Sequence, residues 1–136
     1  MGSRSDSNYD STLPHTDRDG VFHPQGMTSK VISTAVNRTM TADESGSVVI
    51  VTAADKVITL PATQAGLQYT ITLGNGGLSS GTGLSISPNA SDKINAAADD
   101  TDYVNTGATD AVGDSVTVVG DGAGGWYITD QTGTWT

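Results

Sequence analysis

The chain has 136 residues, a formal net charge of −9 and no cysteine. This length fits one domain with an appendage, and the missing thiols exclude disulfides and thiolate metal sites. The first 38 residues hold four basic and four acidic side chains, whereas the rest of the chain holds two basic and eleven acidic ones. Because an acidic domain repels nucleic acid phosphates and anionic membranes, we expect no nucleic acid and no membrane as a partner.

The first 30 residues are predicted to form an N-terminal arm. Large apolar residues are sparse in 1–30, so this segment alone cannot bury enough surface to offset the entropy lost on ordering. Its prolines favour extended, non-helical backbone. Two interpretations stay open, a disordered tail or an extended arm that orders when isolated apolar anchors contact a partner, and we favour the arm. Its anchors are Tyr9, Leu13, Val21 and Phe22.

Short apolar and β-branched runs alternate with turn residues from residue 31 onward, which indicates an all-β domain. The clearest run places Tyr69, Ile71 and Leu73 on one face of a strand and threonines on the other. We predict a compact antiparallel β-sandwich or barrel-like domain over 31–136, with no helix longer than a turn or two. The predicted strands before the C-terminal region are 31–36, 48–51, 57–60, 69–73, 84–87, 93–94 and 103–104.

The stretch 110–135 predicts a terminal β-hairpin. Val116 and Val118 alternate with polar residues, and the glycine-rich segment 120–125 separates them from the aromatic and β-branched run 126–129. The glycines match the pattern G-x-G-x-x-G. A dinucleotide site requires those glycines to open a helix, whereas a strand is expected here. We therefore interpret 120–125 as a turn and predict no cofactor.

Two patterns are typical of catalytic sites but lack the required context. Segment 77–81 matches G-x-S-x-G with Ser79 as the nucleophile. That motif needs a helix after it and a histidine later in the chain, whereas a strand is expected next and both histidines, His15 and His23, come earlier. The acidic pair 43–44 is adjacent in sequence, so its side chains should diverge rather than act together. We expect the chain not to be an enzyme.

Two patterns contain residue types that bind metal ions. His15 and His23, with Asp17 and Asp19, carry ligand types for zinc or nickel, but the arm offers no rigid scaffold. Segment 99–102 is rich in the carboxylates that calcium prefers, but it does not fit an EF-hand loop, so a solvated acidic loop is the default. No metal site is assigned from the sequence.

Five segments of the β-domain follow a pattern of turn glycines and strand residues. They read TADESG at 41–46, ITLPA at 58–62, AGLQYTI at 65–71, GDSVTVVGDG at 113–122 followed by WY, and GTW at 133–135. This pattern resembles small β-domain proteins of tailed-bacteriophage virions. The resemblance implies a capsid decoration protein, of the cement or head-fibre-like kind. It implies a structural homotrimer on the outer surface of the capsid that contacts subunits of the major capsid protein.

The N-terminal arm lies outside that resemblance, and we expect it to anchor the protein on the capsid. Fully extended, about 29 residues span up to roughly 100 Å, enough to cross a subunit boundary. The alternative function is a carbohydrate- or host-binding β-module of a head or tail fibre. In that case Trp126, Tyr127 and Trp135 would form an exposed platform for sugar stacking, although aromatic residues in a hairpin more often pack in the core.

Overall fold

The computed structural model describes residues 15–16, 22–23, 29–75 and 83–136. Within them the protein is built from strands arranged in three sheets of two, four and six strands. The strands are β1 (His15–Thr16), β2 (Phe22–His23), β3 (Val31–Thr34), β4 (Arg38–Thr39), β5 (Val48–Val51), β6 (Val57–Thr59), β7 (Gln68–Leu73), β8 (Ser85–Ser87), β9 (Lys93–Ile94), β10 (Tyr103–Val104), β11 (Ser115–Gly120) and β12 (Gly125–Thr132).

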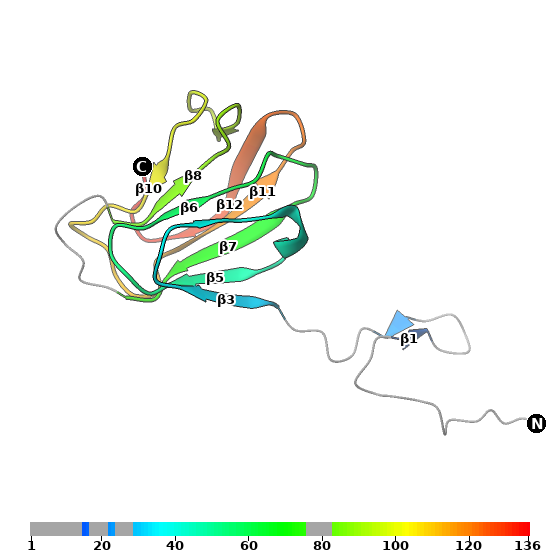
Figure 1. Ribbon diagram of the computed structural model, residues 1–136, viewed down its shortest axis with the longest axis horizontal. Helices are drawn as coiled ribbons and strands as arrows, with labels where there is room; N and C mark the ends of the chain where they lie inside the picture. Colours follow the sequence, from blue (N-terminus) through cyan, green and yellow to red (C-terminus); the bar gives the residue numbers. More distant parts are fainter. Residues whose placement is uncertain (1–14, 17–21, 24–28, 76–82) are drawn as a thin grey trace, which may run out of the picture.

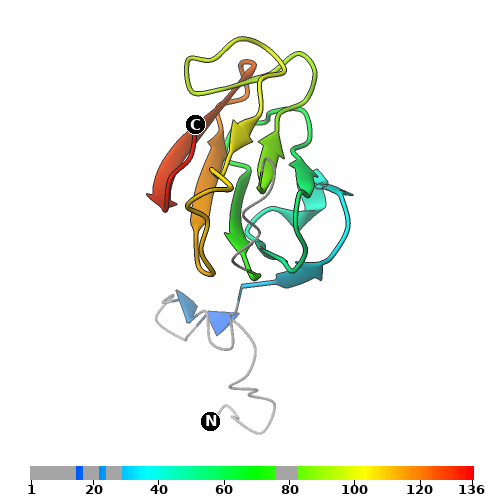
Figure 2. The ribbon, with the colours of Figure 1, turned by 90° about the vertical axis from the view of Figure 1, so that its left-hand side faces the viewer.

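Successive strands from β3 to β8 alternate between the two larger sheets (Figure 1). The six-stranded sheet has the order β3-β5-β7-β11-β12-β9, and the four-stranded sheet has the order β10-β8-β6-β4. The chain therefore winds as a coil from β3 to β8, placing one strand in each sheet per turn. In Figure 2, the β11–β12 pair (orange and red) stands on the side of the molecule away from β3.

The expected antiparallel arrangement was wrong for most of the strand pairs in the two larger sheets. Neighbours β3–β5, β5–β7, β4–β6, β6–β8 and β9–β12 are parallel, and only β7–β11, β11–β12 and β8–β10 are antiparallel. For the four parallel pairs between β3 and β8, the coil is the physical reason. A chain that crosses to the other sheet before returning comes back in the same direction, as a parallel neighbour. The predicted all-β character and the terminal hairpin are confirmed.

One hydrophobic core receives side chains from both larger sheets. Alternation within β5 and β7 turns Val49, Val51, Tyr69, Ile71 and Leu73 inward, and all five are fully buried. The parallel register places Val49 beside Ile71 and Val51 beside Leu73. Burying an aliphatic side chain of this size contributes about 1.5–3 kcal/mol relative to exposing it. The four-stranded sheet adds Ile58 and Ile86, which are partners in the β6–β8 register.

The N-terminal strands β1 and β2 form the separate two-stranded sheet, in which His15 is opposite His23. Three of the predicted arm anchors, Tyr9, Leu13 and Val21, lie outside the described residues. The fourth, Phe22, belongs to β2, but its side chain is likewise outside the described part of the structure. The predicted anchoring role of these four residues therefore stays a prediction.

Candidate functional site

The outward side of the six-stranded sheet carries no charged side chain on β3, β5, β7 or β11. Two rows cross these strands in register, and most of their side chains are half-buried by their neighbours. Thr70 and Thr117 join adjacent strands through a 2.9 Å hydrogen bond between their hydroxyl oxygens. We call this surface the outer face. Its rows are Val31, Val48, Thr70 and Thr117, and Ser33, Ile50, Thr72 and Ser115.

The aromatic platform that the alternative function would require does not form. Trp126 is fully buried, and its ring centroid lies 5.8 Å from that of Tyr69 in the core. Trp135 is 6% exposed and stacks on Tyr103 with centroids 5.9 Å apart. Only Tyr127 is exposed, at 50%, because it points to the opposite side of β12 from Trp126. Both tryptophans therefore pack in the core, as is more usual for aromatic residues of a hairpin, and not on the surface as the alternative function would require.

A shallow polar groove of about 410 Å³ opens beside β12. Two departures from regular sheet shape it. The β11–β12 register shifts between Thr117, opposite Asp130, and Val118, opposite Ile128, which leaves Thr129 as an extra residue in a β-bulge. In addition, β9 covers only the first two residues of β12. The groove is lined by Asn95, Tyr103, Ile128, Thr129, Asp130 and Gln131.

Hydrogen bonds hold the polar side chains of the groove in place. The Tyr103 hydroxyl donates to Oε1 of Gln131 at 2.5 Å, and Nε2 of Gln131 donates to the carbonyl of Gly133 at 3.3 Å. The Ile128 N–H donates to Oδ1 of Asn95 at 3.1 Å, which turns the Asn95 amide nitrogen away from β12. Asn95 has a left-handed backbone, with φ of 54°. The groove thus presents amides, a phenol and the carboxylate of Asp130, a set suited to hydroxyl-rich ligands.

The sequence patterns did not point to this groove. Asn95 directly follows β9, Tyr103 begins the two-residue strand β10, and Asp130 and Gln131 lie near the end of β12. They come together because β12 extends past the predicted 126–129 to Thr132 and because the chain then returns beside β10. A left-handed asparagine is a weak sequence signal, since asparagine adopts that conformation in many ordinary turns.

The glycine-rich segment 120–125 is a turn, as predicted, and hydrogen bonds within the turn hold its shape. Oδ1 of Asp121 accepts the N–H groups of Ala123 at 2.7 Å and of Gly125 at 2.9 Å. These bonds hold the pKa of the Asp121 carboxyl below its usual value. The carboxylate therefore occupies the amide donors that a phosphate would need, and a strand rather than a helix follows the turn.

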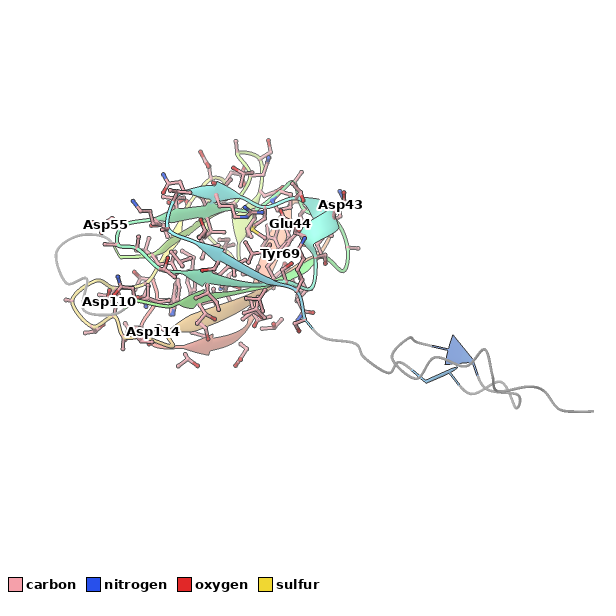
Figure 3. The ribbon with its side chains drawn as sticks, turned by 60° about the horizontal axis from the view of Figure 1, so that its bottom comes forward. Asp43, Glu44, Asp55, Tyr69, Asp110 and Asp114 are labelled. Atoms are coloured by element: carbon pink, nitrogen blue, oxygen red, sulfur yellow. The ribbon has the colours of Figure 1, made fainter. Side chains whose placement is uncertain are left out.

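The adjacent acids Asp43 and Glu44 diverge as expected, Asp43 into solvent and Glu44 into the molecule (Figure 3). Oε1 of Glu44 accepts from Thr41 N–H at 2.9 Å and Thr41 Oγ1 at 3.0 Å, and Oε2 pairs with the Arg38 guanidinium. Burial raises the pKa of Glu44, but hydrogen bonds from Arg38 and Thr41 outweigh it and leave that pKa below its usual value. The pKa of the Tyr69 hydroxyl is raised, mainly by burial and further by the negative charges of Glu44 and Asp43.

The remaining motif residues are either outside the described residues or in solvent. Ser79 and its whole G-x-S-x-G segment are outside the described residues, as are Asp17 and Asp19. In the acidic loop, Asp99 lies 3.7 Å from the ammonium of Lys93 and both side chains are well exposed, so Asp99 belongs to a surface ion pair. Within 29–75 and 83–136, no group of three or more His, Cys, Asp or Glu side chains is placed to hold a metal ion.

Comparisons with known proteins do not identify a family. A scan against protein-family models gives no match, and a search of curated proteins gives none either. Among the described residues, no helix has the length and apolar character that crossing a membrane requires.

Proposed function

We propose that this chain is a structural protein of a tailed-phage virion that binds the outer surface of the capsid as a homotrimer and decorates or cements the major capsid protein. The proposal is supported by the sequence resemblance described above. The structural observation that carries it is the outer face, which is uncharged across β3, β5, β7 and β11 and meets its first charged residue at Asp130 of β12. An extended β-surface of valine, isoleucine, threonine and serine can pack against another protein without burying an unpaired charge.

The position of the outer face within an acidic chain strengthens this reasoning. From residue 39 onward the chain holds eleven acids and two basic residues, yet β3, β5, β7 and β11 carry none of them on the outer face. We also infer that the four- and six-stranded sheets are the layers of a sandwich and that 1–30 is an extended arm. The arm would lead directly into β3, the edge strand beside the outer face.

The arm is tested by deleting residues 2–26 and measuring cosedimentation with empty phage capsids. We expect a trimer in solution and at least a tenfold loss of capsid affinity, which corresponds to about 1.4 kcal/mol. In the full chain, the arm should be cleaved by a protease when free and protected on capsids. Unchanged binding by the deletion variant would reject the arm as anchor.

The outer face is tested with Thr72→Lys, which places a charge in the middle of the second row. We expect this variant to lose capsid binding or trimer formation while its Tm stays close to that of the parent. Val112→Lys is the control, because Val112 is 68% exposed on the loop before β11 and belongs to neither row of the outer face. Equal behaviour of the two variants would contradict the role of the outer face.

The polar groove supports a second candidate, a carbohydrate- or host-binding module. Its test is a screen of the full chain against bacterial surface glycans. A ligand of the groove should bind the parent and Asp100→Ala equally and bind Asp130→Ala at least tenfold more weakly, since Asp130 would accept sugar hydroxyls. Tyr103→Phe should also weaken binding because it releases Gln131. Failure of every glycan to bind, together with capsid binding, would exclude this candidate.

A further inference from the structure

We propose that the connection between β10 and β11 holds a calcium ion, with oxygen ligands from Asn105, Asp110 and Asp114. This site shares no residue with the outer face or the groove, and the proposal does not depend on the virion function. It rests on buried oxygen atoms that lack donors.

Asn105 is fully buried, and its amide orientation is fixed. Its Nδ2 donates to Oδ2 of Asp114 at 3.1 Å and to the carbonyl of Thr134 at 3.2 Å, which uses both amide hydrogens. Flipping the amide would place its oxygen against two acceptors. Oδ1 is therefore an acceptor, and it is buried without a hydrogen-bond partner. A buried acceptor in this state destabilises the folded protein unless a donor or a cation satisfies it.

One carboxylate contacts this amide, and a second lies on the same connection. Asp114 is 6% exposed, and its Oδ2 accepts only neutral donors, the Asn105 amide and the Ala111 N–H at 3.0 Å. Asp110 precedes Ala111, and its Oδ2 is also buried and without a partner. Figure 3 shows Asp110 and Asp114 at the same end of the molecule. Neither forms an ion pair with a described residue.

The chemistry of these oxygens favours calcium. Two carboxylates with one excess amide oxygen cannot satisfy one another, because all are acceptors. Calcium binds six to eight oxygens, including carboxylates, amide carbonyls, backbone carbonyls and water, in flexible geometry, so irregular loops can hold it. The loop also supplies backbone carbonyls. A bound calcium ion would neutralise the carboxylates of Asp110 and Asp114, which form no ion pair with a described basic side chain. Magnesium fits less well, because it demands near-octahedral geometry and keeps its water.

The test uses the full chain, stripped with EDTA and dialysed, with Tm measured while CaCl2, MgCl2 or NaCl of matched ionic strength is added. At a calcium concentration a hundredfold above Kd, we expect Tm to rise by about 5–10 °C. Magnesium should give a clearly smaller rise, and NaCl none beyond the screening of charge. Calorimetric titration of the parent should show one calcium ion per chain.

Asp110→Asn is the decisive variant, since it removes one ligand charge while keeping the shape of the side chain. We expect it to lose most of the calcium-induced rise in Tm. Asp100→Asn is the matched control with the same charge change, in the exposed acidic loop where the left-handed backbone, with φ of 58°, suits asparagine. Its response to calcium should equal that of the parent. If Asp110→Asn does not fold, the calorimetric titration of the parent still decides.

Three results would overturn the proposal. The first is no change in Tm and no heat of binding up to about 10 mM calcium. A site with a Kd above that concentration would bind calcium more weakly than extracellular calcium modules do. The second is an equal rise with calcium and magnesium, which would indicate general screening of the acidic chain. The third is an equal response of Asp110→Asn and Asp100→Asn, which would place any bound ion elsewhere.

Discussion

Gly133 lies flat against the carboxylate of Asp114. A Cβ added at Gly133 would stand 2.3 Å from Cγ of Asp114 and 2.5 and 2.6 Å from its two oxygens. The turn after β12 also gives Gly133 a φ of 92°, in the region that favours glycine. This glycine therefore lets the chain close over a buried acid before Trp135 returns beside β10.

Gly133→Ala should destabilise the protein more than Gly46→Ala does. Both glycines have positive φ, but a Cβ at Gly46 would meet nothing within 4 Å. Gly46→Ala should cost about 1–2 kcal/mol of unfolding free energy from backbone strain alone. Gly133→Ala adds overpacking against Asp114, about 1–3 kcal/mol more. Urea denaturation of the two variants measures the difference, and equal costs would contradict the contact.

Glu44→Gln should lower the unfolding free energy by about 1–3 kcal/mol at pH 7, since it weakens a buried carboxylate bound by Arg38 and Thr41. The native pKa of Glu44 lies below its usual value of about 4.3. Ionised Glu44 therefore contributes stability that is complete above that value and is lost as the pH falls through the native pKa.

The difference in Tm between the parent and Glu44→Gln should accordingly shrink as the pH is lowered below about 4. Asp43→Asn is the control. Its side chain is exposed, so its effect at neutral pH should stay within about 0.5 kcal/mol. A difference between the parent and Glu44→Gln that does not change with pH would show that shape rather than charge accounts for the loss.

Trp126→Ala should lower the free energy of unfolding by about 3–5 kcal/mol, because it leaves a cavity at a fully buried site beside Tyr69. Trp126→Phe should cost less, about 1–3 kcal/mol, since Nε1 of Trp126 donates to no described residue and no hydrogen bond is lost with it. Thermal unfolding followed by circular dichroism compares the two. Tyr127→Ala, on the exposed side of the same strand, should have a small effect, and a large one would show that this side is covered.

Asn95→Ala should destabilise the wall of the groove more than Asn95→Gly. Alanine loses the hydrogen bond to Ile128 N–H and strains the left-handed backbone, whereas glycine loses the bond alone. Backbone strain should lower the free energy of unfolding by about 1–2 kcal/mol, and loss of the hydrogen bond should lower it by about 0.5–1.5 kcal/mol. Denaturation midpoints of the two variants separate these contributions, and a less stable glycine variant would contradict the role of backbone strain.

Strand positions followed from the sequence because local patterns encode them. The apolar run Val48–Val51 is β5, and Lys93–Ile94 and Tyr103–Val104 are β9 and β10 as expected. β4 was missed because Arg38–Thr39 is too short and too polar to show alternation. Strand direction was predicted wrongly because each parallel neighbour in the coil is separated along the chain by a strand of the other sheet, and a local pattern carries no record of that crossing.

The candidate sites were less accessible from the sequence than the fold. The groove depends on a bulge at Thr129 and on the return of the chain beside β10, and neither has a distinctive pattern. The buried acceptor of Asn105 depends on where Asp114 and Thr134 lie after folding. Such sites arise from tertiary geometry, so residue types that look like ordinary loop composition acquire a role only once the two sheets are assembled.

The coil also gives the molecule two unlike ends. β3 and β4 are the outermost strands of their respective sheets, so another turn of chain ahead of Val31 would lengthen both sheets while every existing strand pair stayed intact. At the far end, the β11–β12 hairpin reverses the chain direction and stops this repetition. The fold can therefore be extended at one end only. A designed enlargement of this protein belongs at its amino-terminal end, immediately before β3.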